Sequence, residues 1–500
     1  MLRASSYTIY VDLPDNAEEM LLIHGYSGAY DKVSRRVATY VRSLEAGRPP
    51  KPLFGEWRPE VPIEGEVIPP SEATIAVLKK RGHLTEMTIE EEEAFFSQLV
   101  TKMHQYVRHG MPSYIFMPTY NCNLRCSYCF QDHMRTDRHF NHLLRPMQHS
   151  MVDRIYAAMR TIEANHGVPA DAQRRRNIGL FGGEPLLASN RPIVEYIMRQ
   201  ALECGEASFW SVTNGTDLQA YQDLLGPGGI ARLQITLDGP PDEHDRRRIY
   251  ANGQGSFARI ARNITMALDS GVQVSVRLNI DRGNIAQLPA LMDEIKARGW
   301  DRYQEFSTYT APIHAANTHT EIHTTFGSWE LSQALHALHQ QHPTMQVIRP
   351  PDDGLTDRAR QIFAQQRDPL PNFKASFCGA HNRMYIFDAF GDIYACWERT
   401  GDPSIRIGSV TEAGDVLFND GVNQLWRSRT VASNPVCRKC RYALYCGGGC
   451  AVLAMEHTGE FHTNYCDGFG QRFRASVAEA YQDHVAGVSV EARPERLCTA

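Results

Sequence analysis

The sequence predicts an α/β protein built around a partial (β/α)6 TIM-like barrel. In its middle part, six short apolar segments alternate with segments of helical periodicity. Strand and helix candidates of another pattern precede them, and glycine and cysteine become frequent after residue 373. Because alternating β and α units form parallel sheets with right-handed crossovers, the middle part favours a barrel. We expect an N-terminal winged-helix-like module before it and a C-terminal cysteine-rich domain after it.

Residues 1–111 are expected to form the N-terminal module. The segments SYTIYVDL and EMLLIHGY alternate as strands do, and SGAYDKVSRRVATYVRSL has helical apolar spacing that begins near Ser27. Residues 47–70 are rich in proline and glycine, which predicts a loop. The segments SEATIAVLKKRGHL and TIEEEEAFFSQLVTKMHQYV each begin with Ser or Thr followed closely by Glu, which is typical of capped helices.

The barrel is expected to occupy residues 112–326. Its strand candidates are SYIFMPT, NIGLFGG, SFWSVTNG, RLQITLDG, VQVSVRLNI and YQEFSTYT, separated by helical segments such as RPIVEYIMRQALECG. Residues 327–372 predict a helical bridge. Residues 373–500 have the composition of a domain that bound metal holds together, because periodic helices fade there while cysteines accumulate.

Composition limits the possible partners and compartment. The chain has 500 residues, a formal net charge of −5, and neither a basic stripe nor a charged tail, so we expect no nucleic-acid partner. The N-terminus lacks an apolar signal-peptide region, and no apolar run is long enough to cross a bilayer. We therefore expect a cytoplasmic protein without a membrane partner. Twelve cysteines in a reducing compartment favour metal ligation over disulfides.

Two basic runs and one group of histidines are interpreted as solvated or structural residues. Arg174–Arg176 and Arg246–Arg248 predict solvated loops, with a patch for an acidic peptide as the alternative. His314, His319 and His323 follow the last strand candidate in a polar, threonine-rich stretch. This setting favours solvated or structural histidines over a metal site.

The segment NCNLRCSYCF places Cys122, Cys126 and Cys129 in a CX3CX2C pattern directly after a strand candidate. In a parallel barrel, the loop after a strand lies at the face where active sites form. Three thiolates can hold three irons of a [4Fe–4S] cluster, which leaves the fourth iron open to the amine and carboxylate of an amino acid. Taken alone, the spacing also allows a zinc site or free buried cysteines.

This motif closely resembles that of the radical S-adenosylmethionine (SAM) superfamily. The resemblance implies that SAM binds at the open iron and that one electron releases a 5'-deoxyadenosyl radical, which abstracts hydrogen from a substrate. It also implies a [4Fe–4S] cluster on the three cysteines and an aromatic residue, here Tyr128, packed near the adenine. The cofactor-binding residues implied by the resemblance are Tyr128, Gly182, Gly183, Glu184, Ser211, Asn214, Asp238 and Arg277.

The GGEP turn carries the second part of this resemblance. It follows the next strand candidate, and in the superfamily it grips the amino group of the cofactor. Glycines let the backbone approach closely, and Glu184 offers a carboxylate to an ammonium group. Ser211 and Asn214 resemble ribose contacts. Asp238 and Arg277 lie at or near the ends of the next strand candidates.

The C-terminal cysteines have the spacing CX12GX4C, then CX2CX5CX3C, then one further cysteine, with Gly391 as the glycine. This pattern resembles the SPASM signature, an iron–sulfur extension of many peptide-modifying radical enzymes. The resemblance implies two auxiliary [4Fe–4S] clusters. The outer cluster would have Cys437, Cys440, Cys446 and Cys466, and the inner cluster would have Cys378, Cys396 and Cys450. CX2C pairs also occur in zinc knuckles, but seven ligands do not divide into two zinc sites of four cysteines.

Two departures from sulfatase-maturating relatives concern the inner cluster. Those relatives have an additional cysteine soon after the first one, whereas residues 379–395 contain none. The fourth ligand is therefore left open between His381, Cys204, Cys498 and an open iron.

The second departure concerns the catalytic base. In sulfatase maturases an aspartate acting as base directly follows the second cysteine of this group. Here Trp397 follows Cys396, and Glu398 comes next. We name Glu398 as the candidate general base, and a surface carboxylate is the alternative.

Together these features predict an oxidoreductase, a radical SAM maturase of ribosomally made peptides (RiPPs). Two further clusters suit oxidative modification of side chains, such as a crosslink, a thioether or a dehydrogenation, because they can accept an electron. The N-terminal module resembles elements that bind a leader peptide as an added strand, with a stabilising cap on the barrel as the alternative. We expect a precursor peptide with a leader segment and a one-electron donor such as a flavodoxin or ferredoxin. A sulfatase-maturase-like oxidase, a small-molecule radical enzyme, and an iron–sulfur electron-transfer or scaffold protein are the alternatives.

Overall fold

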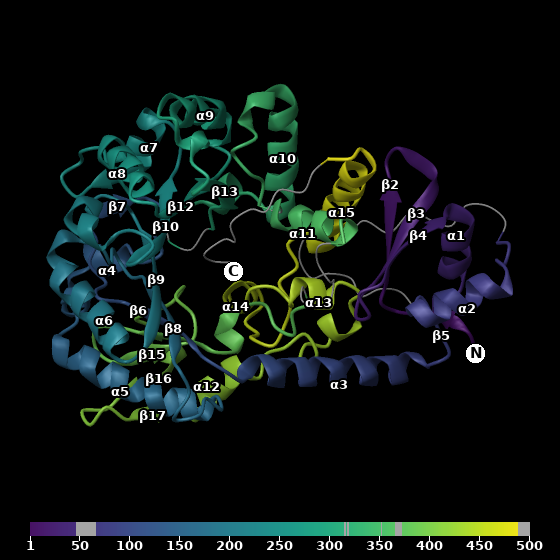
Figure 1. Ribbon diagram of the computed structural model, residues 1–500, viewed down its shortest axis with the longest axis horizontal. Coiled ribbons are helices and arrows are strands. Elements are labelled where there is room, and N and C mark those ends of the chain that lie inside the picture. Colours follow the sequence, from purple (N-terminus) through teal and green to yellow (C-terminus); the bar gives the residue numbers. More distant parts are fainter. Residues whose placement is uncertain (47–66, 315–316, 318–319, 352, 366–372, 489–500) are drawn as a thin grey trace.

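The computed structural model describes residues 1–46, 67–314, 317, 320–351, 353–365 and 373–488. In Figure 1 the barrel lies on one side and the N-terminal module on the other, with residues 443–485 of the C-terminal segment between them. The long helix α3 (Ile89–Arg108) runs along one side of the molecule and connects the module to the barrel. In the described ranges, no helix is both long and apolar enough to cross a bilayer.

A ten-stranded sheet with the order β13-β12-β10-β9-β8-β6-β14-β15-β16-β17 forms the centre of the molecule. Its six parallel strands are β6 (Ser113–Phe116), β8 (Arg175–Leu180), β9 (Glu206–Thr213), β10 (Ile230–Leu237), β12 (Gln273–Ile280) and β13 (Phe306–Pro312). All six coincide with predicted strands. In the described residues β13 is an end strand that pairs with β12 alone, so the sheet does not close into a barrel. The parallel strands and the helices between them confirm the α/β prediction.

The C-terminal segment continues this sheet. Strand β14 (Met384–Phe387) pairs in parallel with β6, and the antiparallel strands β15 (Asp392–Tyr394), β16 (Arg406–Val410) and β17 (Val416–Phe418) follow. No local sequence pattern predicts these four strands. They are only three to five residues long, and β14 gains its hydrogen bonds from the free edge of β6, which no local pattern reveals.

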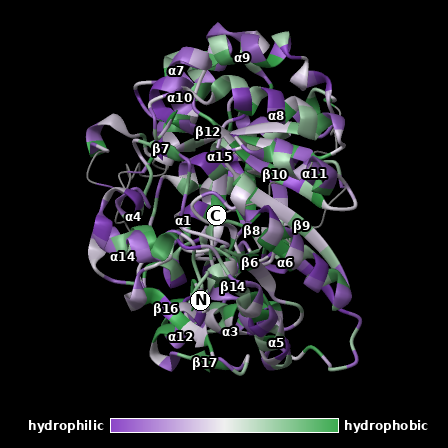
Figure 2. Ribbon diagram, turned by 90° about the vertical axis from the view of Figure 1, so that its left-hand side faces the viewer, coloured by the Kyte–Doolittle hydropathy of each residue, from purple (hydrophilic) through white to green (hydrophobic). Residues whose placement is uncertain are grey.

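Helices pack around the sheet with buried apolar stripes, and Figure 2 shows hydrophilic and hydrophobic residues alternating along the outer helices. The helices of the barrel are α4 (His133–Thr136), α5 (His149–Asn165), α6 (Arg191–Glu203), α7 (Pro241–Arg247), α8 (Phe257–Asp269) and α9 (Leu288–Ala297). The later helices are α10 (Ser328–Gln341), α11 (Asp353–Phe363), α12 (Asp420–Arg427), α13 (Ala443–Cys446), α14 (Ala451–Thr458) and α15 (Phe469–Val485). The predicted bridge contains α10 and α11.

The described residues of the N-terminal module form an antiparallel sheet and three helices. The sheet has the order β2-β3-β4, and a short strand pair lies beside it. Its elements are β1 (Arg3–Ala4), β2 (Thr8–Leu13), β3 (Asn16–His24), β4 (Tyr30–Ser34), α1 (Arg35–Ser43), α2 (Glu72–Arg81), β5 (Leu84–Thr85) and α3. The first two predicted strands and the two capped helices are present. Thr88 forms a capping box with Glu91, and Ser71 caps α2. That the module is a winged helix stays a prediction.

The helix predicted to begin near Ser27 is wrong in its first half. Residues Tyr30–Ser34 form strand β4 instead, because they pair in register with β3. The helix begins at Arg35, where the hydroxyl of Ser34 accepts a hydrogen bond from the backbone of Val37. Most of the predicted loop, residues 47–66, lies outside the described residues.

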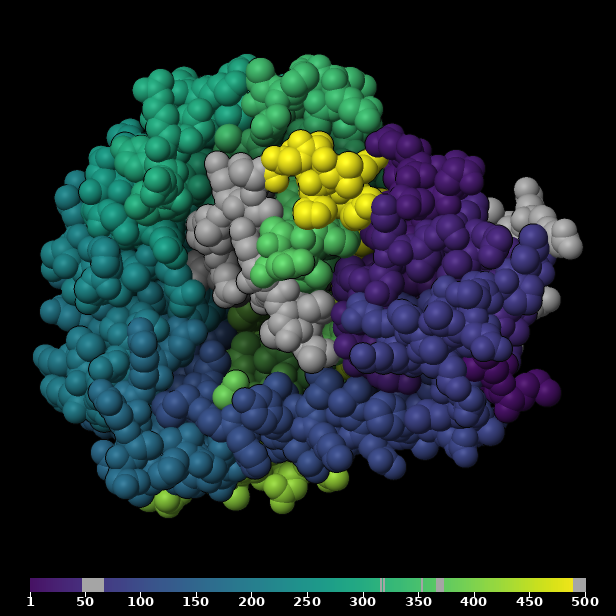
Figure 3. Space-filling model, turned by 45° about the vertical axis from the view of Figure 1, so that its right-hand side comes forward, coloured from purple at the N-terminus to yellow at the C-terminus, as the bar shows by residue number. Residues whose placement is uncertain are grey.

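The module packs directly against the cysteine-rich segment. Tyr7 and Phe96 share a buried cluster with Val431 and Leu444, and the Tyr7 hydroxyl donates to the carbonyl of Arg438 across 2.5 Å. The apolar face of β2 packs against α15, and Figure 3 shows the two segments in contact. The module therefore contacts the cysteine-rich segment, whose described residues include seven cysteines.

The prediction that the basic runs are solvated loops is wrong for most of their residues. Arg174 and Arg176 both form ion pairs with the buried carboxylate of Glu163 at 2.8 Å. Arg247 pairs with Asp281, and Arg248 is buried. The partners of these cations come from other segments of the chain, and the amino-acid composition of a basic run does not reveal them.

Candidate active site

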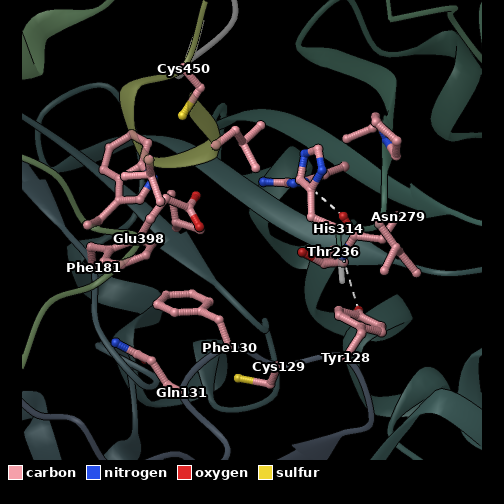
Figure 4. Close-up of a pocket in the computed structure, with 18 of the residues that line it drawn as sticks. Tyr128, Cys129, Phe130, Gln131, Phe181, Thr236, Asn279, His314, Glu398 and Cys450 are labelled. Carbon is pink, nitrogen blue, oxygen red and sulfur yellow. Dashed lines mark hydrogen bonds between the residues drawn. The ribbon is translucent and has the colours of Figure 1, made fainter. Parts of the chain in front are cut away.

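One cavity of about 1650 Å³ lies at the carboxyl ends of the parallel strands. The first cysteine loop, the GGEP turn and the ends of β9, β10, β12 and β13 line one side, and the cysteine-rich segment lines the other. Figure 4 shows Cys129 on one side of this cavity and Cys450 on the other. The cavity therefore brings together cysteines from the two ends of the chain.

The first cysteine loop is held by a short strand pair. Strand β7 (Leu124–Cys126) pairs with β11 (Arg248–Tyr250) so that Cys126 lies opposite Arg248. The backbone N–H of Cys129 donates to the carbonyl of Cys126 across 3.1 Å, which closes a turn. The pKa of Cys126 is raised to about 12, mainly by burial and also by the neighbouring thiolates of Cys129 and Cys122, while Arg248 opposes the rise. The three thiols are therefore close neighbours.

Two arginines that no sequence motif marks as functional lie beside these thiols. The guanidinium of Arg135 donates from Nη2 to the sulfur of Cys129 across 3.0 Å. Arg248 is buried, and its interaction with Cys126 raises its own pKa. Positive charge beside a thiol favours the thiolate, which is the form that binds metal. Neither arginine belongs to a recognisable sequence motif.

The hydroxyl of Tyr128 is the centre of a buried hydrogen-bond network. It donates to Asp238 Oδ2 across 2.6 Å, and it accepts from Arg248 Nη1 at 2.8 Å and from Asn279 Nδ2 at 3.1 Å. Burial raises the pKa of Asp238. Asp238 is not among the residues that line the cavity, so its visible function is to hold Tyr128.

The glycines of the GGEP turn permit a close approach of two backbone segments. A Cβ atom on Gly182 would lie 2.5 Å from the carbonyl oxygen of Thr119, and one on Gly183 would lie 2.3 Å from that of Tyr120. The N–H of Gly183 donates to Thr119, and that of Glu184 donates to Asn121 at 2.8 Å. The turn is therefore fastened to the segment that leads into the first cysteine loop, which explains the glycines without a cofactor.

Glu184 is almost fully buried, and its carboxylate accepts three hydrogen bonds. The donors are the backbone of Leu186 at 2.8 Å, the hydroxyl of Thr213 at 2.7 Å and the backbone of Asn214 at 2.5 Å. Burial raises the pKa of Glu184 to about 7, and these bonds oppose the rise. The carboxylate lines the cavity and also joins the turn to β9. Its predicted contact with an ammonium group stays a prediction.

The other predicted cofactor contacts differ in their position. Asn214 lines the cavity and donates to Asn123 Oδ1 across 2.8 Å. Arg277 also lines it, and its Nε donates to Asn279 at 2.8 Å. Ser211 is fully buried, and its hydroxyl donates to the carbonyl of Leu180 at 3.1 Å. The structure thus brings Asn214 and Arg277 to the cavity and leaves Ser211 outside its lining.

The thiols of the C-terminal segment form two groups of neighbours, whose members raise one another's pKa. The inner group is Cys378, Cys396 and Cys450, and the outer group is Cys437, Cys440, Cys446 and Cys466. Burial is the largest cause of the raised pKa in each of these thiols. The division is the same as that of the two ligand sets implied by the resemblance.

Three consecutive glycines bring the two groups together. Gly447–Gly449, between Cys446 and Cys450, have φ values of +80°, +90° and +74°, which other residues rarely adopt. A Cβ atom on the first would lie 2.7 Å from Cα of Phe377, and one on the last would lie 2.1 Å from the carbonyl oxygen of Tyr465. Both neighbours directly precede a cysteine in the sequence. The GGG run was a visible signal that the sequence analysis did not use, whereas Gly391 was predicted and has φ +83°.

The donor set fits iron–sulfur clusters. Across the described ranges, no three Cys, His, Asp or Glu side chains surround a single point closely enough to hold one metal ion. The ligands of a [4Fe–4S] cluster bind different irons of a cube, so they lie farther apart than the ligands of one ion. Groups of three, three and four thiols, with cationic side chains beside them, have the chemistry that such clusters need.

Of the alternatives for a fourth ligand of the inner group, His381 lies in the described part of the same segment. His381 is fully buried, its Nδ1 donates to the carbonyl of Trp426 at 2.9 Å, and its Nε2 has no partner within the described ranges. Cys204 lies at the end of α6, where its carbonyl accepts a hydrogen bond from Arg176. Cys498 lies outside the described residues.

Glu398 points into the cavity between the first and the inner cysteine groups (Figure 4). The side chain is exposed to the solvent in the cavity. The protein around the cavity still raises the pKa of the carboxyl by desolvation, and the nearby Arg277 opposes this. Its charge in turn raises the pKa of Cys396 and Cys450. Beside it, the rings of Phe181 and Trp397 stack with centroids 5.4 Å apart. The candidate base is therefore a cavity residue.

Comparison with known families identifies the domain that carries the first cysteine group. Residues 116–295 match the model of the Radical SAM superfamily. This segment is therefore a radical SAM domain, which implies SAM and a [4Fe–4S] cluster as cofactors.

Similar proteins extend the resemblance beyond this domain. The chain is 21% identical over 389 residues to a cysteine-type anaerobic sulfatase-maturating enzyme of Clostridium novyi (strain NT), covering 73% of this chain and 96% of that protein. It is 27% identical to a GTP 3',8-cyclase of Rhizobium etli (strain CIAT 652) over 37% of this chain and 48% of the cyclase. Native anSMEcpe with bound AdoMet and Cp18Cys peptide has the same fold, with a TM-score of 0.52, 16% identity, and coverage of 75% of this chain and 99% of that chain.

Proposed function

We propose that this chain is a radical SAM peptide maturase that oxidatively modifies side chains of a ribosomally made precursor peptide. One observation carries the proposal. A single cavity is lined by Cys122, Cys126 and Cys129, by Cys450 of the inner group and by Cys446 of the outer group. An enzyme that only cleaves SAM needs the first group, whereas oxidation also needs acceptors for an electron close to the substrate.

The first cysteine group and the GGEP turn are proposed to hold the cofactors. Cys122, Cys126 and Cys129 would bind a [4Fe–4S] cluster, and Glu184 and Asn214 lie beside it in the cavity. When bound there, SAM and the cluster supply a 5'-deoxyadenosyl radical. Tyr128, held by Asp238 and its other partners, fixes the third cysteine of the loop in place.

Glu398 is proposed as the group that accepts a proton at its carboxylate. It lies in the cavity next to the inner group, which would bind one auxiliary cluster, while the outer group would bind the other. A substrate radical that loses an electron to a nearby cluster also releases a proton, and a carboxylate in the cavity can take it. An external one-electron donor, such as a flavodoxin or ferredoxin in the cytoplasm, is part of this proposal.

A peptide substrate is supported by the size of the cavity. Sites for small molecules are typically about 300–1,000 Å³, and this cavity exceeds that range. It therefore has room for a cofactor and a segment of a peptide. The fold shared with peptide-bound anSMEcpe supports the same class of substrate.

The leader segment is proposed to bind to strand β4 of the N-terminal module. In the described part of the chain, β4 pairs with β3 on one side only, so its other edge has no strand partner. An extended peptide can add a strand to such an edge. Because the module packs on the cysteine-rich segment, a leader held there would deliver the following residues toward the cavity.

The test is anaerobic co-expression with a short peptide encoded beside the gene, followed by mass spectrometry of the peptide. We expect the peptide to lose a pair of hydrogens for each modification, and 5'-deoxyadenosine to form. A Cys126→Ala variant is the control and should produce neither change. The purified enzyme should contain about 12 irons per chain.

The possible failures have different meanings. Cofactor cleavage with an unchanged peptide mass would contradict oxidative modification and favour epimerisation or another substrate. Full iron content without any 5'-deoxyadenosine would contradict an enzyme and favour an electron-transfer or scaffold protein.

A sulfatase-maturase-like oxidase is the second candidate, because the chain aligns with almost all of the C. novyi enzyme. Against it, Trp397 follows Cys396 where sulfatase maturases have the aspartate base. Incubation with a sulfatase-derived cysteine peptide separates the two functions, since only the second candidate oxidises it.

A further inference from the structure

Arg429 is a buried cation that bonds only to backbone carbonyls. Its side chain is almost fully buried. It donates from Nη1 to Gly449 at 3.0 Å, from Nη2 to Gly448 at 3.2 Å and to Thr463 at 2.8 Å, and from Nε to Phe461 at 3.0 Å. Throughout the described residues, none of its hydrogen bonds goes to a carboxylate.

These bonds place the guanidinium between the inner and outer cysteine groups. Gly448 and Gly449 belong to the loop that joins Cys446 of the outer group to Cys450 of the inner group. Thr463 lies three residues before another outer cysteine. The pKa of Arg429 is lowered by burial and raised by thiolates of both groups, which are Cys437, Cys446, Cys378 and Cys450.

Burial of an unpaired charge is costly, so buried cations are normally paired with anions. Carbonyl dipoles satisfy the N–H groups of Arg429, but they do not neutralise its charge. Cys437, Cys446, Cys378 and Cys450, from both groups, act on its charge. Cysteines bind a cluster as thiolates, so the ligands of both groups would supply the negative charge that balances Arg429.

We propose that Arg429 is a shared counter-charge for the two auxiliary clusters and makes both of them easier to reduce. This inference rests on the proposed function, in which each group binds a [4Fe–4S] cluster. Accepting one electron makes a cluster more negative by one unit. A fixed positive charge in buried surroundings, where screening is weak, stabilises that reduced form.

Arg427 provides a matched comparison two residues away. It is equally buried, and it donates to the carbonyls of Ala380 at 2.6 Å and Met384 at 2.8 Å. Ala380 belongs to the turn directly after Cys378 of the inner group, and the charge of Cys378 acts on Arg427. Arg427 should therefore affect the inner cluster alone, whereas Arg429 should affect both.

The test uses the full-length chain with Cys122, Cys126 and Cys129 changed to Ala, so that only the auxiliary clusters give signals. After anaerobic reconstitution, each cluster is titrated with dithionite and followed by electron paramagnetic resonance. Arg429→Gln should make both clusters about tenfold harder to reduce, which for one electron corresponds to a potential about 59 mV lower. Arg429→Lys, which keeps the charge, should shift both by much less, and Arg427→Gln should shift one cluster only.

Each outcome decides the proposal. Unchanged potentials, or a shift of only one cluster, in an Arg429→Gln variant with full iron content would overturn it. Loss of iron in Arg429→Gln with retention in Arg429→Lys would support it, because the clusters would then need the charge itself. Equal loss in both variants would show that Arg429 acts by packing alone. Iron near zero in the parent chain would instead overturn the proposed function, and this inference with it.

Discussion

The hydroxyl of Tyr128 donates a hydrogen bond of 2.6 Å to Asp238, which joins the first cysteine loop to the end of strand β10. The same hydroxyl accepts from Arg248 and Asn279. Four residues from four segments thus share one buried oxygen. The position of the loop that is proposed to bind the cluster depends on this network.

We expect Tyr128→Phe to lower the free energy of unfolding by about 1–3 kcal/mol, because it leaves buried polar partners without their hydrogen bond. The measurement is urea unfolding of the protein before cluster reconstitution. Tyr196→Phe is the control, since that hydroxyl bonds to Asp153 at the surface and its loss should cost less than about 0.5 kcal/mol. Equal effects of the two variants would contradict the role of the network.

Iron analysis tests the first and the inner cysteine groups. We expect Cys126→Ala and Cys450→Ala each to remove about four irons per chain, because each cysteine would bind a different cluster. Cys204→Ala should leave the iron content unchanged, since that residue lies at the end of α6. If Cys204→Ala also removed about four irons, Cys204 would be a ligand and the division into groups would be wrong.

Gly449→Ala should destabilise the cysteine-rich segment and reduce its iron content. The new Cβ would lie 2.1 Å from the carbonyl oxygen of Tyr465, at a φ of +74°. Gly459→Ala is a matched control, because Gly459 has a φ of +73° and nothing within 4 Å of its Cβ position. Alanine in the left-handed conformation costs about 1–2 kcal/mol in both variants. Only Gly449→Ala adds a steric clash with Tyr465. Thermal unfolding and iron analysis should therefore separate them.

Stability should depend on pH through Asp388. Burial raises the pKa of this carboxyl to about 7, and the hydroxyl of Tyr120 donates to it at 2.9 Å. A raised pKa means that the folded chain binds the proton more tightly than the unfolded chain does. The stabilisation is therefore complete below about pH 4 and is lost as the pH rises to about 7, by about 1.4 kcal/mol per pH unit. Unfolding of Asp388→Asn across this range should lack that contribution, and an unchanged slope would contradict it.

Glu398→Gln should lower the rate of peptide modification by about 100-fold or more, which is typical for loss of a general base. Formation of 5'-deoxyadenosine should continue, because the residue lies outside the first cysteine group. The two products are measured together by chromatography and mass spectrometry. Glu460→Gln, at the surface, is the control. Full modification activity in Glu398→Gln would exclude it as the base.

The sequence by itself determined the six parallel strands, the capped helices α2 and α3, and the cysteines that form each group. These features are local or depend on fixed spacing. A strand alternates within a few residues, and a CX3CX2C loop carries its three thiols on one short segment. The alternation of a strand and the spacing of the cysteines can be recognised without knowledge of tertiary contacts.

Only the tertiary structure decided which polar residues surround those thiols. Arg248 belongs to a run that composition assigns to solvent, yet it is buried opposite Cys126. Strand β14 forms because the edge of β6 accepts it, and Arg429 lies between two cysteine groups because the glycine loop bends there. Each of these placements depends on a partner far away in the chain. Local sequence patterns do not determine such contacts, because the energy that stabilises them exists only when the distant segment is already in place.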